Sequence, residues 1–197
     1  MGRRKSTVCA PREEEYYGGF PYRNRFRTSA LSPGAATSGS SRFGSVGVRE
    51  GVVLPTIHVV DKDGKRIALD FNGNRRSVLY ILSPTCIWCK RNKANIVMLA
   101  SAESSQIRFI GLSTAPDRLG EYVKGSALPF PVYALSSPAE VRKFGLLDVT
   151  PQTVLVATGG KVQKVWTGAF QGAEQKEIES FFDVKLPGLQ ESAAASD

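Results

Sequence analysis

The stretch SVLYILSPTCIWCKRNKANIVMLA, residues 77–100, decides which fold this chain can adopt. Residues 78–82 form a short apolar run followed by turn residues, which indicates a buried strand. Residues 90–100 contain no Gly or Pro, which favours a helix. The Cys-x-x-Cys pair formed by Cys86 and Cys89 therefore lies where a strand is followed by a helix.

The position of Cys86 at the start of a helix favours its thiolate. Unpaired backbone N–H groups and the helix dipole stabilise an anion there, so we expect the Cys86 thiol to ionise more readily than a free cysteine. A spacing of three residues places Cys89 on the same helical face, close enough for a disulfide. A thiolate that attacks, beside a second thiol that releases the product, is the minimum requirement for dithiol–disulfide exchange.

The segments after the pair alternate between strand and helix patterns. A second buried strand is predicted over residues 106–112, and helices are predicted over 116–124 and 138–144. Two strands around Gly159-Gly160 then form a hairpin, and an apolar stripe that includes Phe182 predicts a final helix. This order indicates an α/β domain with a mixed sheet.

A Cys-x-x-Cys pair after a strand, with Thr150-Pro151 just before a hairpin, resembles the thioredoxin fold. The stretch Thr150-Pro151-Gln152-Thr153 is most similar to the ResA/TlpA-type thiol–disulfide oxidoreductases of the thioredoxin-like superfamily, a branch that merges into the redoxin (AhpC/TSA-like) group. The similarity covers residues 51–187. It implies a central mixed β-sheet flanked by helices, with an N-terminal β-hairpin extension.

The resemblance also implies roles for five residues. Cys86 would attack a substrate disulfide, and Cys89 would resolve the mixed disulfide that results. Pro151 would be cis, and the Thr150 backbone would hydrogen-bond a substrate peptide as an added strand. Trp88, inside the pair, would belong to the substrate-docking surface.

Two further neighbours, Thr85 and Lys90, are candidates for stabilising the Cys86 thiolate. The chain also departs from thioredoxins proper, which have a buried acid six residues before the first cysteine. Tyr80 occupies that position here, and Ile87-Trp88 replaces the Gly-Pro between the cysteines. The route of proton transfer and the direction of exchange are therefore left open by the sequence.

Other interpretations of the pair stay open. Peroxiredoxins have a Pro-x-x-x-Thr/Ser-x-x-Cys pattern, and here Ser83 fits the hydroxyl position while Leu79 replaces the proline. A peroxiredoxin-like thiol peroxidase with an antioxidant role is thus one alternative, and a non-catalytic thioredoxin-fold binding module is another. A zinc site would need two more ligands, but the remaining Cys and His, Cys9 and His58, lie in no partner motif. We expect neither a metal nor a cofactor.

Composition indicates one domain with a tail at each end. The chain has 197 residues, of which 42% are hydrophobic, enough for one full-sized core. Residues 1–48 contain eight Lys or Arg and three acids, and so supply +5 of the formal net charge of +8. Their Arg-, Gly- and Ser-rich stretches predict a basic, disordered segment. We assign residues 49–187 to the thioredoxin-like domain and 188–197 to a disordered tail.

The expected partners are protein disulfides or dithiols and an upstream dithiol electron donor. The basic, aromatic N-terminal segment is expected to be a solvated tail rather than a specific nucleic-acid site. We expect a monomer. The sequence contains no apolar stretch typical of a signal peptide or membrane span, which predicts a cytoplasmic protein as the chain is given. A true N-terminus further upstream would instead predict an extracytoplasmic one.

Overall fold

The computed structural model describes residues 48–103, 105–137, 139 and 149–191, all within the unit Arg42–Asp197. Most of the predicted basic segment 1–48 and of the helix predicted over 138–144 lies outside the described residues, as do residues 192–197 of the predicted tail. Among the residues described, no helix has the length and apolar character needed to span a bilayer.

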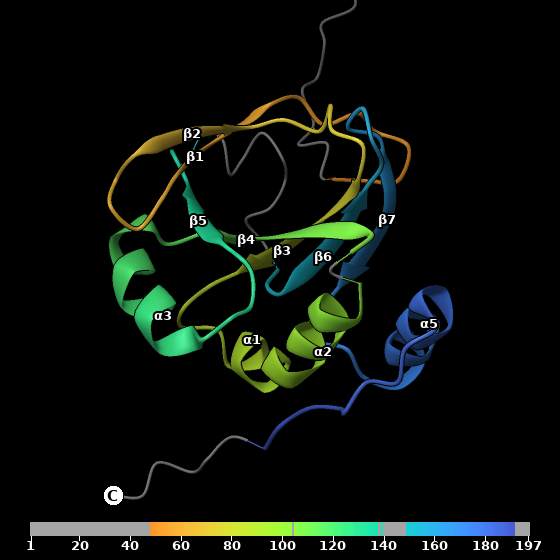
Figure 1. Ribbon diagram of the computed structural model, residues 1–197. Coiled ribbons are helices and arrows are strands. Elements are labelled where there is room, and N and C mark those ends of the chain that lie inside the picture. The colour runs from red at the N-terminus through yellow and green to blue at the C-terminus, as the bar shows by residue number, and fades with distance from the viewer. Residues whose placement is uncertain (1–47, 104, 138, 140–148, 192–197) are drawn as a thin grey trace, which may run out of the picture. The chain divides into compact units, whose positions relative to one another are not determined.

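One mixed sheet of seven strands, in the order β2-β1-β5-β4-β3-β6-β7, organises the domain (Figure 1). Its central strand is β3 (Arg76–Leu82), which pairs in parallel with β4 (Ile107–Ser113) and antiparallel with β6 (Gln152–Val156). All residues of β3 after Arg76 are buried, as a strand covered on both faces requires. The buried strands predicted over 78–82 and 106–112 are confirmed.

A hairpin lies at one edge of the sheet and confirms the predicted N-terminal extension. Its strands are β1 (Ile57–Val60) and β2 (Arg66–Leu69), which are antiparallel. Strand β1 joins the hairpin to the rest of the sheet by pairing with β5 (Val132–Leu135).

The other edge is the predicted C-terminal hairpin, in which β6 is followed by β7 (Val162–Thr167). The turn passes through Gly160, whose φ of 86° is in the left-handed region that favours glycine. A Cβ atom there would lie 2.7 Å from the Leu54 carbonyl oxygen, so the position accepts only glycine.

Among the residues that the structure describes, four helices pack with one face of the sheet (Figure 1). They are α1 (Ile87–Arg91), α2 (Lys93–Glu103), α3 (Leu119–Ser126), which follows the short 3-10 turn η1 (Pro116–Arg118), and α5 (Gly172–Phe182). Alternate residues of β3 point to opposite faces, so Tyr80 and its i±2 neighbours meet the helices, while Leu79 and Ile81 join a second apolar cluster.

The helix expected after the cysteine pair is divided at Asn92, which is fully buried between α1 and α2. The Asn92 Oδ1 atom accepts hydrogen bonds from the Phe170 N–H and from Asn95 Nδ2, each at 3.0 Å. Its Nδ2 donates to the Tyr80 hydroxyl at 3.5 Å. One amide thus connects the helix that holds the pair to β3 and to the loop between β7 and α5.

Further hydrogen bonds lie beyond the domain boundary predicted at residue 187. The Gly188 N–H donates to Asn95 Oδ1 at 2.8 Å, and the Gln190 N–H donates to the Arg91 carbonyl at 2.9 Å. The segment after α5 therefore returns to α1, which holds Cys89, and to α2.

Replacing Asn92 by Ala should destabilise the protein by about 1–3 kcal/mol, because the buried Phe170 N–H loses its acceptor. Urea unfolding measures the change. Tyr80→Phe is the matched control in the same cluster: it removes only the hydroxyl at 3.5 Å, so its effect should be smaller. Equal losses for the two variants would contradict the role assigned to the Asn92 amide.

Candidate active site

The cysteine pair lies at the end of the central strand. After β3 the chain turns through residues 83–85, and the Cys86 N–H donates to the Ser83 carbonyl at 3.1 Å. Cys86 is then the N-terminal cap of α1, and its sulfur accepts a hydrogen bond from the Cys89 N–H at 3.2 Å. Both cysteines are free thiols; Cys86 is half-buried, whereas Cys89 is buried with 4% exposure.

The structure brings the second motif, Thr150-Pro151, against the first. The Cys86 thiol donates a hydrogen bond to the Thr150 carbonyl oxygen at 3.2 Å, although the two residues are 64 positions apart. The Thr150–Pro151 peptide bond is cis. The Pro151 carbonyl accepts from the Gly168 N–H at 2.8 Å, which attaches this loop to the residue just after β7.

The environment of Cys86 favours its thiolate. Burial alone would raise the pKa of Cys86, but hydrogen bonds from the Cys89 thiol, the Thr150 side chain and the backbone N–H groups of Cys89 and Trp88 outweigh it, so the pKa is lowered. The two groups of Thr150 act in opposite directions. Its carbonyl accepts from the protonated thiol, whereas its side chain stabilises the anion.

The pKa of Cys89 is shifted in the opposite direction to that of Cys86. Its burial, followed by its hydrogen bond with the Cys86 sulfur, raises the pKa of Cys89 to about 12. The pair therefore consists of one thiol that ionises more readily than a free cysteine and one that stays protonated at neutral pH. This is the division between nucleophile and resolving thiol that disulfide exchange requires.

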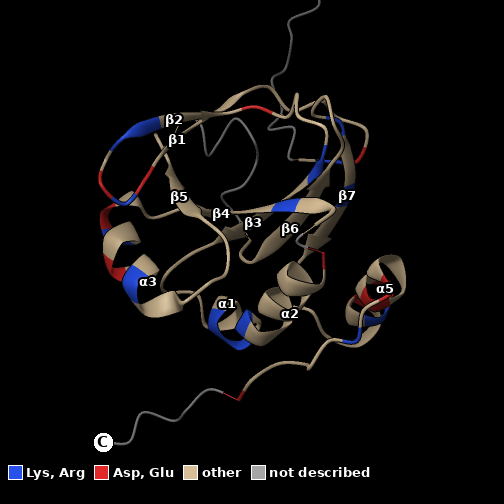
Figure 2. Ribbon diagram, viewed as in Figure 1, with Lys and Arg blue, Asp and Glu red and all other residues tan. Residues whose placement is uncertain are grey.

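Three other residues singled out in the sequence surround the pair. Trp88 is 41% exposed, and the Arg91 guanidinium lies over its ring at 4.8 Å from the centroid. The Thr85 hydroxyl lies 3.1 Å from the Ser83 hydroxyl, and Lys90 lines a pocket beside Cys89. Within the described part of the chain, neither Thr85 nor Lys90 hydrogen-bonds the Cys86 sulfur. Figure 2 shows Lys and Arg grouped on α1, the helix that contains Cys89.

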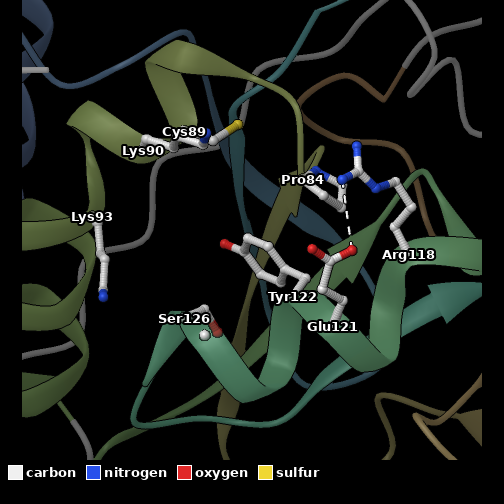
Figure 3. Close-up of a pocket in the computed structure, with 9 residues that line it drawn as sticks. Pro84, Cys89, Lys90, Lys93, Arg118, Glu121, Tyr122 and Ser126 are labelled. Carbon is white, nitrogen blue, oxygen red and sulfur yellow. Dashed lines mark ion pairs between the residues drawn. The ribbon is translucent and has the colours of Figure 1, made fainter. Parts of the chain in front are cut away.

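Sequence reasoning missed Tyr122, which comes from α3 and lines the same pocket as Cys89 (Figure 3). Burial, then the charges of the two cysteine sulfurs, raise the pKa of Tyr122 to about 12. Burial also raises the pKa of Tyr80, which lies beneath the pair. Neither phenol is ionised at neutral pH. No group of three or more His, Cys, Asp or Glu suited to a metal ion occurs in the ranges that the structure describes.

Replacing Thr150 by Val should raise the pKa of Cys86, because the hydroxyl that stabilises the thiolate is lost while the backbone carbonyl remains. The rate of iodoacetamide alkylation at Cys86, followed against pH by mass spectrometry, rises as pH passes through this pKa, so the curve should move to higher pH. Thr85→Val removes a hydroxyl that is paired with Ser83 and should leave the curve in place. A larger shift for Thr85→Val would reverse this assignment.

Comparison with solved structures identifies the fold. A thiol:disulfide interchange protein from Bacteroides sp. is 19% identical, with a TM-score of 0.55 over 70% of this chain and 92% of that one. The thioredoxin domain of a thiol-disulfide oxidoreductase from Bacteroides vulgatus is 19% identical, with a TM-score of 0.54 over 68% and 99%. A thioredoxin family protein from Chlorobium tepidum TLS, a thiol:disulfide interchange protein, is 19% identical, with a TM-score of 0.53 over 68% and 97%.

No protein-family model and no curated protein sequence matches the chain. Its similarity to known proteins is therefore a similarity of structure, and in these three comparisons it covers 68–70% of this chain. The central mixed sheet flanked by helices, extended by the β1–β2 hairpin, is the thioredoxin-like fold, as the sequence motifs predicted.

Proposed function

We propose that the protein is a thiol–disulfide oxidoreductase that exchanges disulfides with protein substrates through Cys86 and Cys89. The observation that supports this function best is the asymmetry of the pair. Cys86 is half-buried and has a lowered pKa, whereas Cys89 is buried and has a pKa raised to about 12. The similarity to thiol:disulfide interchange proteins supports the same chemistry.

Exchange proceeds in two displacements. The Cys86 thiolate attacks one sulfur of a substrate disulfide, forms a mixed disulfide and expels the other substrate sulfur as a thiolate. Cys89 then gives up its proton and attacks the Cys86 sulfur, which forms the Cys86–Cys89 disulfide and releases the second substrate thiolate. Two electrons pass from the pair to the substrate, and an upstream thiol donor must return two electrons to restore the pair.

The surface around Cys86 suits a protein substrate. Ile87, Trp88 and Val149 are 48%, 41% and 43% exposed. Ile87 and Val149 are next in sequence to the two residues of the Cys86–Thr150 contact, and Trp88 follows Ile87. Exposed apolar side chains grouped at one site are typical of protein interaction surfaces. The Thr150 backbone would hydrogen-bond the substrate as an added strand beside this apolar surface.

Cys86→Ser should reduce insulin disulfide reduction, with dithiothreitol as the dithiol, to the uncatalysed rate, because a serine hydroxyl is not ionised at neutral pH. Cys89→Ser should instead accumulate a mixed disulfide between Cys86 and the substrate, seen as a mass increase that a reductant reverses. Cys9→Ser is the matched control and should keep full activity.

Two results would overturn this proposal. Stronger trapping by Cys86→Ser than by Cys89→Ser would reverse the roles of the two thiols. Faster consumption of a hydroperoxide than of insulin disulfides would favour the peroxidase alternative instead. The Ser83 hydroxyl, which would serve that alternative, lies 3.1 Å from the Thr85 hydroxyl.

A further inference from the structure

A pocket lies between the helices α1 and α2 on one side and α3 on the other, and it reaches Cys89 (Figure 3). It has a volume of about 330 Å³, which is within the range of small-molecule sites. Cys89 lines the pocket but Cys86 does not. The resolving thiol can therefore be approached from a side on which the nucleophile is not reached. The lining residues are Pro84, Cys89, Lys90, Lys93, Arg118, Glu121, Tyr122, Gly125 and Ser126.

The pocket lining has an excess of positive charge. Lys90 and Lys93 lie on one side, and Arg118 lies on the other with Glu121, its partner at 3.6 Å (Figure 3). Among the residues that the structure describes, Lys90 and Lys93 form no hydrogen bond or ion pair through their side chains. Two ammonium groups are thus available to a ligand, and they favour one that has carboxylate groups.

The two sulfurs of the oxidised pair differ as leaving groups. A thiol that attacks the Cys86 sulfur expels Cys89, whose conjugate acid has a pKa of about 12. A thiol that attacks the Cys89 sulfur expels Cys86, whose thiolate is stabilised by its neighbours. A thiolate whose thiol has a lower pKa leaves faster, so attack at the Cys89 sulfur, which lines the pocket, is favoured over attack at the Cys86 sulfur.

We propose that this pocket binds a small thiol that has carboxylate groups, and that this thiol reduces the Cys86–Cys89 disulfide by attack at Cys89. The inference rests on the proposed exchange function and names a class of reductant for it. Protein substrates meet Cys86 at the exposed end of α1, whereas the small thiol enters between α1 and α3.

The reaction balances with two small thiols. The first, as its thiolate, bonds to the Cys89 sulfur, and the Cys86–Cys89 bond breaks to give the Cys86 thiolate. The second attacks the sulfur of the bound small thiol, which leaves as the symmetric small disulfide and frees Cys89, which takes up a proton. The small thiols lose two electrons and the protein pair gains them.

The variant Lys93→Gln tests whether the positive charge of the pocket favours a thiol that has a carboxylate group. The oxidised protein is reduced with an excess of 3-mercaptopropionate, which has a carboxylate, or of 2-mercaptoethanol, which is the neutral probe. The reaction is quenched with acid, and the free thiols of the protein are counted by mass spectrometry. The ratio of wild-type to variant rate cancels the intrinsic reactivity of each probe. We expect a ratio of about 3 for 3-mercaptopropionate, as for one exposed ion pair, and about 1 for 2-mercaptoethanol. Lys176→Gln on α5 removes the same charge elsewhere and should give about 1 for both.

The variant Gly125→Leu tests whether the small thiol reaches Cys89 through this pocket. A Cβ atom at Gly125 meets no heavy atom within 4 Å, so a leucine there can enter the pocket without displacing the backbone. It should slow both small thiols by about tenfold or more, as expected when attack must use the poorer leaving group, and leave trapping of protein substrates by Cys89→Ser unchanged. Gly125→Ala is the matched control and should behave as wild type.

The outcomes separate this inference from the proposed function. Unchanged rates with 3-mercaptopropionate in both Lys93→Gln and Gly125→Leu, in a protein that still reduces insulin, would overturn the pocket route alone. A wild-type protein that does not reduce insulin would overturn the exchange function. Equal slowing of both probes by Lys93→Gln would show that charge does not select the thiol, which contradicts the proposal.

Discussion

The hydrogen bond from the Cys86 thiol to the Thr150 carbonyl is the contact on which the site depends, because it joins the two motifs. It follows from the pairing of the strands that precede and follow them. Strands β3 and β6 are antiparallel neighbours with Ile81 opposite Gln152, so the last residues of β3 and the first residues of β6 lie side by side. A slip of one residue in this register would reverse the faces of β6 and separate the motifs.

One helical turn separates two thiols with opposite chemistry. Cys86 caps α1 and receives N–H groups, whereas Cys89 points into the apolar cluster between the sheet and the helices. Burial raises the pKa of both sulfurs, but only Cys86 has enough donors to overcome it. The direction in which each side chain leaves the helix therefore underlies the roles of nucleophile and resolving thiol that we propose for Cys86 and Cys89.

The sequence predicted the parts of the fold that local patterns encode. Adjacent residues predict the apolar run of β3, the cysteine pair after it and the glycine turn before β7. The β1–β2 hairpin was predicted from the resemblance to a known family. Contacts between distant segments were not readable. Asn92 is a polar residue within a helical stretch, and its neighbours in sequence do not predict its hydrogen bond with the Phe170 N–H, 78 residues away. Tyr122 lies within the helix predicted over residues 116–124, but its place beside Cys89 depends on how α3 packs.

The replacement of the buried acid of thioredoxins by Tyr80 limits how Cys89 can lose its proton. The Tyr80 phenol is buried, has a raised pKa, and accepts a hydrogen bond from Asn92, so it is not a base at neutral pH. Tyr122, with a pKa of about 12, is protonated as well. The pocket between α1 and α3 reaches Cys89 from solvent, so water has access to the thiol that must ionise. We therefore propose that water in this pocket accepts the Cys89 proton in place of a buried acid. The opening is the same one that we propose for the small thiol.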